Sequence, residues 1–135
     1  MTPKKLFLDD DLPLNSLRET YLNWTKTQLE KLHYHIDILE QKQERQYNNH
    51  DTEIYKLANY MKDIGGSFGY YLMTDIATSL CDYIQQMESD PHIKICIIIA
   101  HVRAMDMVIH DRIDGSGGEE GEKILLRLQR LALNK

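Results

Sequence analysis

Six histidines have the widest chemical range of the side chains in this sequence, because an imidazole can act as a base, a phosphoryl acceptor or a metal ligand. His33 and His35 stand two residues apart in a helical pattern, which points them to different sides and prevents them from chelating one metal. His92 and His110 lie beside predicted helix ends, among polar neighbours, and are interpreted as surface residues. No zinc site is expected.

Two other histidines are candidates for an acceptor of phosphate. His50 falls in a cluster of turn-forming residues, "QYNNHD", and is interpreted as a solvated loop residue. His101 lies beside Val102 in an apolar helical pattern, and we expect it to be packed and hydrogen-bonded inside the protein.

Acidic and glycine-rich segments predict neither a metal nor a cofactor. The acids of "DDD" at 9–11 and "GEEGE" at 118–122 lack the alternating oxygen ligands and the terminal glutamate of a calcium loop. The glycines at 115–118 follow no strand and precede no lysine-serine or lysine-threonine pair, so they do not form a phosphate-binding loop. Cys81 and Cys96 are interpreted as two reduced core thiols.

A stretch with an apolar helical rhythm and three glycines, "LANYMKDIGGSFGYYL" at 57–72, raises a different possibility. The helix that contains this stretch carries a stripe of residues turned away from its apolar face: Tyr55, Asn59, Lys62, Asp63 and Gly66. A glycine in an exposed helix costs on the order of 1 kcal/mol relative to alanine, so Gly65 and Gly66 need a benefit such as close approach of another backbone or of a partner. The plainer interpretation is that Gly65 allows a neighbouring helix to pack and Gly66 frays the helix end.

The elements that position these residues are predicted to be helices. Ser16 and Glu19 have capping-box spacing, so a first helix is expected from about Leu17 to about Arg45. Its apolar seam holds Leu22, Thr25, Leu29, Leu32, Ile36 and Leu39. A second helix, capped by Asp51 or Thr52, presents Ile54, Leu57, Ala58 and Met61. Gly69 is the expected left-handed stop, after which a third helix packs against the second through Leu72, Ile76, Leu80, Ile84 and Met87.

Two further helices complete the pattern. Asp90 and Pro91 form a start signal for a fourth helix. Its opening "IKICIIIA" also suits a buried strand, but a helical period continues through Ile98, Val102, Met105 and Ile109 and favours a helix. After "DGSGG", a fifth helix begins with acids and presents Ile124, Leu125, Leu128, Leu131 and Ala132.

These elements predict an all-α protein, an up-and-down four-helix bundle with an additional C-terminal helix. Residues 1–15 are expected to be an N-terminal extension and residues 16–135 one helical domain. The net charge of −5 makes nucleic acid an unfavourable partner. The longest apolar run, 95–100, is too short to cross a bilayer, so we expect a cytoplasmic protein without a membrane partner.

The stretch from 57 to 84, with "SLCDYI" at its end, and "HVRAM" at 101–105 resemble histidine-containing phosphotransfer (HPt) domains, particularly a bacterial branch. The positions that agree with the motif of that branch are Ala58, Lys62, Gly65, Gly66, Phe68, Gly69, Tyr70 and Leu72. The resemblance covers about the C-terminal two-thirds of the chain and implies a phosphorelay protein of two-component signalling.

Two departures from the motif bear on the chemistry that the resemblance implies. The phospho-accepting histidine of the family falls on Asn59. The nitrogen lone pair of the Asn59 amide is delocalised into the carbonyl, so this side chain cannot attack a phosphoryl group. Asp63 replaces a glycine and would repel phosphate. Lys62 is retained and can pair with a carboxylate of a partner.

The resemblance therefore implies a binding module rather than an enzyme, with no small-molecule substrate. It would dock a response-regulator receiver domain or a histidine kinase, as an adaptor or competitor, through Tyr55, Asn59, Lys62, Asp63, Gly66, Ser67 and Tyr70. One alternative is an active phosphotransfer protein that uses His50 or His101. Another is a structural bundle that self-associates as a homodimer through its second and third helices.

Overall fold

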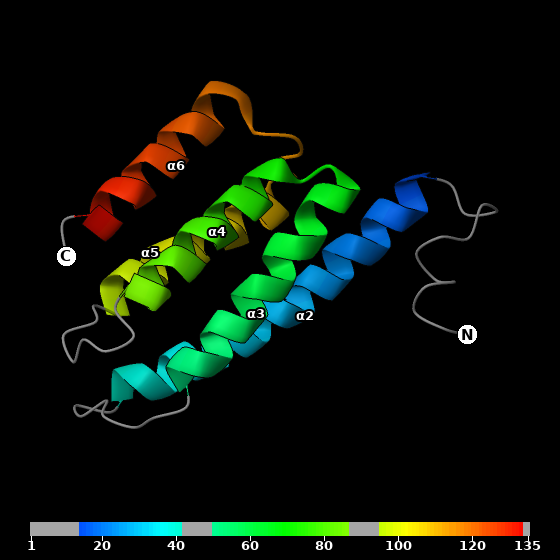
Figure 1. Ribbon diagram of the computed structural model, residues 1–135. Helices are drawn as coiled ribbons and strands as arrows, with labels where there is room; N and C mark the ends of the chain where they lie inside the picture. The colour runs from blue at the N-terminus through cyan, green and yellow to red at the C-terminus, as the bar shows by residue number, and fades with distance from the viewer. Residues whose placement is uncertain (1–13, 42–49, 87–94, 134–135) are drawn as a thin grey trace.

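The computed structural model describes residues 14–41, 50–86 and 95–133, and every regular element in these ranges is helical (Figure 1). Five α-helices and one short 3₁₀ turn follow one another: α2 Leu14–Gln41, α3 His50–Gly65, η1 Gly66–Phe68, α4 Tyr71–Gln86, α5 Ile95–His110 and α6 Gly118–Leu133. The described ranges hold no strand, so the all-α prediction is confirmed for them.

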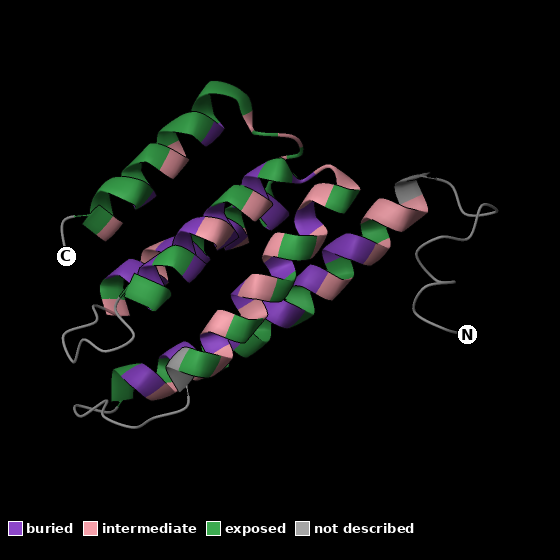
Figure 2. Cartoon of the chain, viewed as in Figure 1, coloured by how far each residue is buried: buried purple, intermediate pink, exposed green. Residues whose placement is uncertain are grey.

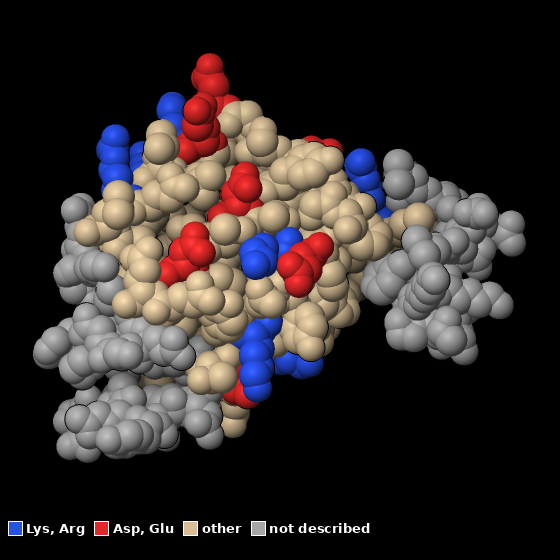
Figure 3. Space-filling view, in the orientation of Figure 1, with Lys and Arg blue, Asp and Glu red and all other residues tan. Residues whose placement is uncertain are grey.

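The helices α2, α3, α4 and α5 contact one another in a ring, each touching the next, and α5 closes the ring on α2. The buried faces of these four helices are turned toward one another, whereas α6 lies outside against α4 and α5 and is largely exposed (Figure 2). On the face that carries α3 and α4, acidic and basic side chains are scattered among uncharged residues, and near its centre a basic side chain lies beside an acidic one (Figure 3). None of the helices in the described part of the chain is both long and apolar enough to cross a membrane.

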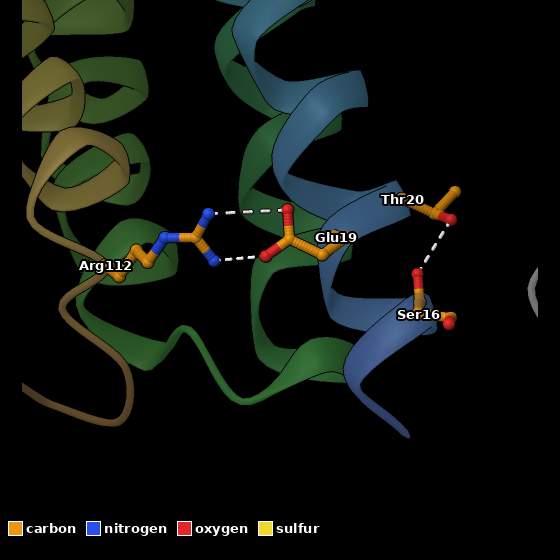
Figure 4. Close-up of polar contacts among 4 residues, drawn as sticks. All are labelled: Ser16, Glu19, Thr20 and Arg112. Atoms are coloured by element: carbon orange, nitrogen blue, oxygen red, sulfur yellow. Dashed lines mark hydrogen bonds and ion pairs between the residues drawn. The ribbon is translucent and has the colours of Figure 1, made fainter. Parts of the chain in front are cut away.

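The apolar seam of α2 is placed as the sequence predicts, but its first turn is not. Leu22, Thr25, Leu29, Leu32, Ile36 and Leu39 are all buried. The helix begins at Leu14, so Ser16 already lies inside it, and the carbonyl of Ser16 accepts a hydrogen bond of 2.9 Å from the hydroxyl of Thr20 (Figure 4).

Glu19 does not form the predicted capping box because its carboxylate is bound elsewhere. Both of its oxygens accept hydrogen bonds from the guanidinium of Arg112, which follows α5 (Figure 4). The hydrogen bond from Arg112 holds the pKa of Glu19 below its ordinary value. The capping-box prediction is therefore wrong, since a residue 93 positions later in the chain takes the carboxylate that the cap would need.

The hairpin of α3 and α4 is confirmed, and these two helices share the most extensive contact in the protein. In α3, Ile54, Ala58 and Met61 are buried and Leu57 packs partly against the core. The helix already begins at His50, ahead of the caps expected at Asp51 or Thr52. Of the apolar positions predicted for α4, the buried ones are Leu72, Ile76, Leu80 and Ile84, and Met87 lies outside the described residues.

The isoleucine-rich segment at the start of α5 is a helix, not a strand. Ile98, Val102, Met105 and Ile109 are buried, so the helical period outweighs the β-propensity of isoleucine. The start signal at Asp90 and Pro91 lies outside the described residues.

The last helix, α6, carries Glu119 and Glu120 in its first turn, as predicted. Leu128 is buried, and Ile124 and Ala132 pack against the core. Leu131 was predicted on this apolar face but is 43% exposed, because α6 covers only one side of α4 and α5 and the edge of its apolar stripe meets no other helix.

Candidate functional site

The junction between α3 and α4 is a tight reversal that ends α3 at the glycines. The amide of Gly69 donates to the carbonyl of Gly66 at 3.2 Å, and the amide of Tyr70 donates to the carbonyl of Gly65 at 2.9 Å. These two bonds form a Schellman motif, which needs a left-handed residue at its turn. Gly69 has φ of 84° and supplies that residue, so the predicted role of Gly69 as a helix stop is confirmed.

Gly65 and Gly66 have different surroundings, although they are adjacent. A Cβ on Gly65 would stand 2.8 Å from Oγ1 of Thr74 and 3.1 Å from the carbonyl oxygen of Tyr70, so α4 packs here on the bare backbone of α3. The same threonine hydroxyl donates to the carbonyl of Lys62 at 3.0 Å. A Cβ on Gly66 would meet nothing nearer than 3.7 Å. The packing interpretation of Gly65 is confirmed, whereas packing within the chain does not require a glycine at position 66.

The stripe predicted to face solvent lies mostly at the border between exposed and buried residues, whereas the exposed positions of this segment are Thr52, Lys56, Tyr60, Asp63 and Ser67. We call the predicted stripe, continued into η1, the α3 crest: Tyr55, Asn59, Lys62, Asp63, Gly66 and Ser67. Asp63 and Ser67 are exposed, and the other four residues are partly buried. Asn59 is therefore not enclosed in the core. The phenol oxygen of Tyr55 accepts a hydrogen bond of 2.9 Å from the side-chain amide of Gln85, which ties this end of the crest to α4.

Tyr70 does not belong to this surface, which corrects its predicted role in partner binding. It is only 3% exposed, its ring stacks on Tyr21 at a centroid distance of 5.1 Å, and burial raises the pKa of its phenol. The residue that follows a left-handed cap often makes an apolar contact with the end of the helix, a signal in the sequence that pointed to burial.

Tyr71 is the exposed tyrosine at this junction, and sequence reasoning missed it. It is 56% exposed, and a Cβ on Gly66 would lie 3.8 Å from its Cδ1. Tyr71 is the first residue of α4, one position before the buried seam that starts at Leu72, which is the pattern that marks it as outward-facing.

The charges at the centre of the α3 crest are Lys62 and Asp63. Among the described residues, neither of them forms an ion pair within 4.0 Å. Both act electrostatically on the nearby Cys81, Lys62 lowering its pKa and Asp63 raising it, but burial dominates and raises the pKa of that thiol to about 11. Cys81 is thus a neutral buried thiol, as predicted, whereas Cys96 is exposed and is not a core residue.

His101 is sealed between α4 and α5. Its Nδ1 lies 2.8 Å from the carbonyl oxygen of Ile97 and must carry the proton, because a carbonyl only accepts. Its Nε2 therefore accepts from the hydroxyl of Ser79, also at 2.8 Å. The side chain is fully buried, and burial lowers its pKa. The prediction of a packed and hydrogen-bonded histidine is confirmed.

The other histidines of the described helices give no metal site. His33 pairs with Asp106 of α5 at 2.8 Å, and His110 pairs with its neighbour Asp111 at 2.9 Å on an exposed surface. His50 is the first residue of α3 rather than a loop residue. Within the part of the chain that the structure describes, no three His, Cys, Asp or Glu side chains are grouped so that they could hold a metal ion. His92 lies outside these residues.

Comparisons with protein-family models, with curated proteins and with solved structures give no match to this chain.

Proposed function

We propose that this chain is an HPt-like binding module of two-component signalling that has lost phosphotransfer. In this proposal α2 to α5 are the four-helix bundle, α6 is the additional helix, and the α3 crest docks a receiver domain or a histidine kinase. The chain would then act as an adaptor or a competitor in a phosphorelay.

The observation that carries the proposal is the position of Asn59 on the α3 crest, one turn before Lys62 and two turns before Gly66. Asn59 is partly buried on its helix but remains partly accessible, so a docking partner can reach it. An amide at this position cannot accept a phosphoryl group, because its nitrogen lone pair is delocalised. Lys62 remains without a carboxylate partner among the described residues, so it can pair with an acidic partner.

The environment of His101 supports the loss of transfer chemistry. Both of its ring nitrogens are engaged in hydrogen bonds, and its side chain is fully buried. Phosphorylation of His101 would require α4 and α5 to separate, so this residue is an unfavourable acceptor.

A binding assay with purified receiver domains and kinase dimerisation domains from the same cell tests the docking role. Wild-type protein is expected to bind at least one of them with a Kd of tens of micromolar or tighter. Lys62→Glu should weaken that binding about tenfold, because a fully or partly desolvated charge pair becomes repulsive. Lys123→Glu is the matched control, since it reverses a charge on α6 and should leave binding unchanged. Failure of every domain to bind would contradict the proposal.

A phosphoryl-transfer assay tests the lost chemistry. Wild-type protein should acquire no acid-labile label from a phosphorylated receiver, whereas Asn59→His combined with Asp63→Gly should acquire it. Acid-labile label on the wild-type chain would instead support a transferase that uses another histidine.

A further inference from the structure

A groove of about 460 Å³ lies between α4 and α6, which run side by side (Figure 1). Its α4 wall extends from Asp75 to Gln86, and its α6 wall extends from Leu125 to Leu133. A helix rises about 1.5 Å per residue, so the α4 wall is about 17 Å long and covers about three turns. The groove is long enough to hold a helical segment of a partner rather than a single side chain.

The α4 wall of the groove carries two unpaired carboxylates. Asp75 and Asp82 are both exposed, and because they are seven residues apart they lie on one face of α4. Neither of them forms an ion pair within 4.0 Å with another described residue. The described residues that line the groove include no lysine, arginine or histidine. Figure 3 shows acidic side chains over α4. This wall therefore attracts positive charge.

The α6 wall of the groove is mostly apolar. Leu125 and Ala132 are partly buried, and Leu133 is 76% exposed. The buried Tyr83 of α4 also lines the groove. An exposed leucine beside other apolar side chains is stabilised when a partner removes it from water. The ligand that fits both walls is therefore amphipathic, with basic side chains next to an apolar stripe.

The spacing of the two carboxylates favours a helical ligand. Asp75 and Asp82 are about 10 Å apart along the axis of α4, because seven residues make about two turns. A helix that lies along α4 presents its own residues at the same spacing and on one side. In an extended strand the same distance spans about three residues, and side chains an odd number of positions apart point to opposite faces. Only the helix directs two basic side chains to both carboxylates.

A second copy of this chain fits the groove less well than a helix of another protein does. Its α6 carries Lys123 and Arg130 seven residues apart, but Lys123 already pairs with Glu120 at 3.8 Å. Glu119 and Glu120 in the first turn of that helix would also bring negative charge towards α4. The net charge of −5 on each copy adds repulsion over longer distances.

We propose that the groove between α4 and α6 binds an amphipathic helix of another protein, which carries two basic residues seven positions apart beside an apolar stripe. Asp75 and Asp82 pair with the two basic residues, and Leu125 and Leu133 cover the apolar stripe. This site uses no residue of the α3 crest, and the inference does not depend on the proposed function.

Fluorescence anisotropy with labelled designed peptides tests this recognition. The matched peptide is an alanine-rich helix of about 18 residues with two arginines seven positions apart and leucines beside them. The control peptide has the same composition, but one arginine is moved so that the two are five positions apart and point to different sides. The matched peptide is expected to bind with a Kd of about 10–100 μM. The control peptide should bind about tenfold more weakly, because only one of its arginines can reach a carboxylate.

Charge reversal in the groove should weaken binding of the matched peptide. Asp75→Lys and Asp82→Lys are each expected to lower the affinity about tenfold, because one attraction becomes a repulsion. Leu133→Ser should lower it about threefold, because it removes apolar surface from the α6 wall. Glu30→Lys is the matched control, since it makes the same change of charge at an exposed position of α2 outside the groove and should leave binding unchanged. Circular dichroism of each variant establishes that its helices are intact.

An exchange of charges provides the decisive comparison. The double variant with Asp75→Lys and Asp82→Lys should bind the matched peptide poorly, and it should bind the same peptide in which glutamates replace both arginines. Wild-type protein should show the opposite preference. A fold disturbed by the substitutions would bind neither peptide, so recovery of binding shows that the groove itself is recognised.

The proposal is overturned if the matched peptide does not bind wild-type protein at submillimolar concentration, if both arginine peptides bind equally, or if exchanging the charges does not exchange the preference. Sedimentation velocity without peptide tests the other occupant, with a reducing agent present because Cys96 is exposed. Wild-type protein should stay monomeric at the concentrations of the peptide assay. Self-association that Asp75→Lys abolishes would show that a second copy occupies the groove, and would also overturn the proposal.

Discussion

His101 is held neutral by the residues around it. Its protonated Nδ1 donates to the carbonyl of Ile97, its Nε2 accepts from Ser79, and burial lowers its pKa below the ordinary 6.5. Protonation would force Nε2 to become a donor and would place a charge between α4 and α5. In the unfolded chain the same histidine is free to bind a proton at its ordinary pKa.

This difference predicts a loss of stability in acid. Because the unfolded state binds more protons than the folded state below about pH 6.5, the free energy of unfolding should fall as the pH decreases from 6.5 towards the lowered pKa of His101. Urea denaturation at a series of pH values measures the free energy of unfolding. In the His101→Gln variant the free energy of unfolding should decrease less over this pH range. The His33→Asn variant serves as the control for an exposed histidine. A wild-type decrease identical to that of His101→Gln would refute this account.

Tyr70 and Tyr71 are neighbouring residues of the same type, yet Tyr70 is buried and Tyr71 is exposed. The Schellman turn directs Tyr70 onto Tyr21, and the following helix begins with Tyr71 outside. The residue type is the same at both positions, so the only sequence signals are positional: Tyr70 follows the glycine cap, and Tyr71 precedes the buried seam that starts at Leu72. The pattern of buried and accessible residues could be predicted more securely within the regular part of α3 than at the turn that follows it.

At the junction of α3 and α4, a glycine allows two helices to pack closely. Gly65 lies under Thr74, whose hydroxyl is already engaged by the carbonyl of Lys62 and cannot move aside without losing that bond. Gly66 begins the 3₁₀ turn, and a Cβ there would make ordinary van der Waals contacts with Thr74 and Tyr71 at 3.7–3.9 Å without a clash. The two positions therefore differ in packing, although both lie at the end of one helix.

Replacing each glycine by alanine should separate these roles. Gly65→Ala is expected to lower the free energy of unfolding by about 1–3 kcal/mol, because a methyl group is forced against α4. Gly66→Ala should be neutral or stabilising by up to about 1 kcal/mol, because alanine is the better helix former. Urea denaturation of the two variants measures the difference. Equal effects of the two substitutions would show that backbone freedom, not packing, explains Gly65.

The ends of α2 and α5 show why helix termini were the least predictable elements. The predicted cap at Ser16 failed because the helix already begins at Leu14, and Glu19 binds Arg112 instead of the backbone near Ser16. Arg112 itself has φ of 52°, and the amide of the next residue, Ile113, donates to the carbonyl of Val108 at 2.9 Å, so an arginine ends α5 in a conformation that usually calls for glycine. Neither arrangement follows from local sequence, since each depends on a contact between distant helices.

At the scale of the whole molecule, one hydrophobic core joins all five described α-helices. Buried side chains from α2 to α5 form a single cluster, and Leu128 of α6 belongs to it. Trp24, the only tryptophan of the chain, packs partly against this core from α2. Its fluorescence therefore reports on α2, while far-UV circular dichroism reports on every helix.

A shared core predicts one cooperative unfolding transition. Tryptophan fluorescence and circular dichroism should give the same midpoint in urea, because a domain of this size with a continuous core unfolds in a two-state manner. Loss of helical signal at lower urea than the change in Trp24 fluorescence would show that an element such as α6 unfolds separately.

The sequence by itself determined the helical class and the apolar seams, because a repeat of 3.6 residues assigns each side chain of a regular helix to one face. Leu22, Ile76 and Val102 are buried for that reason. Only the tertiary structure decided where Glu19 finds its partner and which glycine is packed. These depend on the approach of segments far apart in the chain, and that approach is set by the joint packing of all the helices.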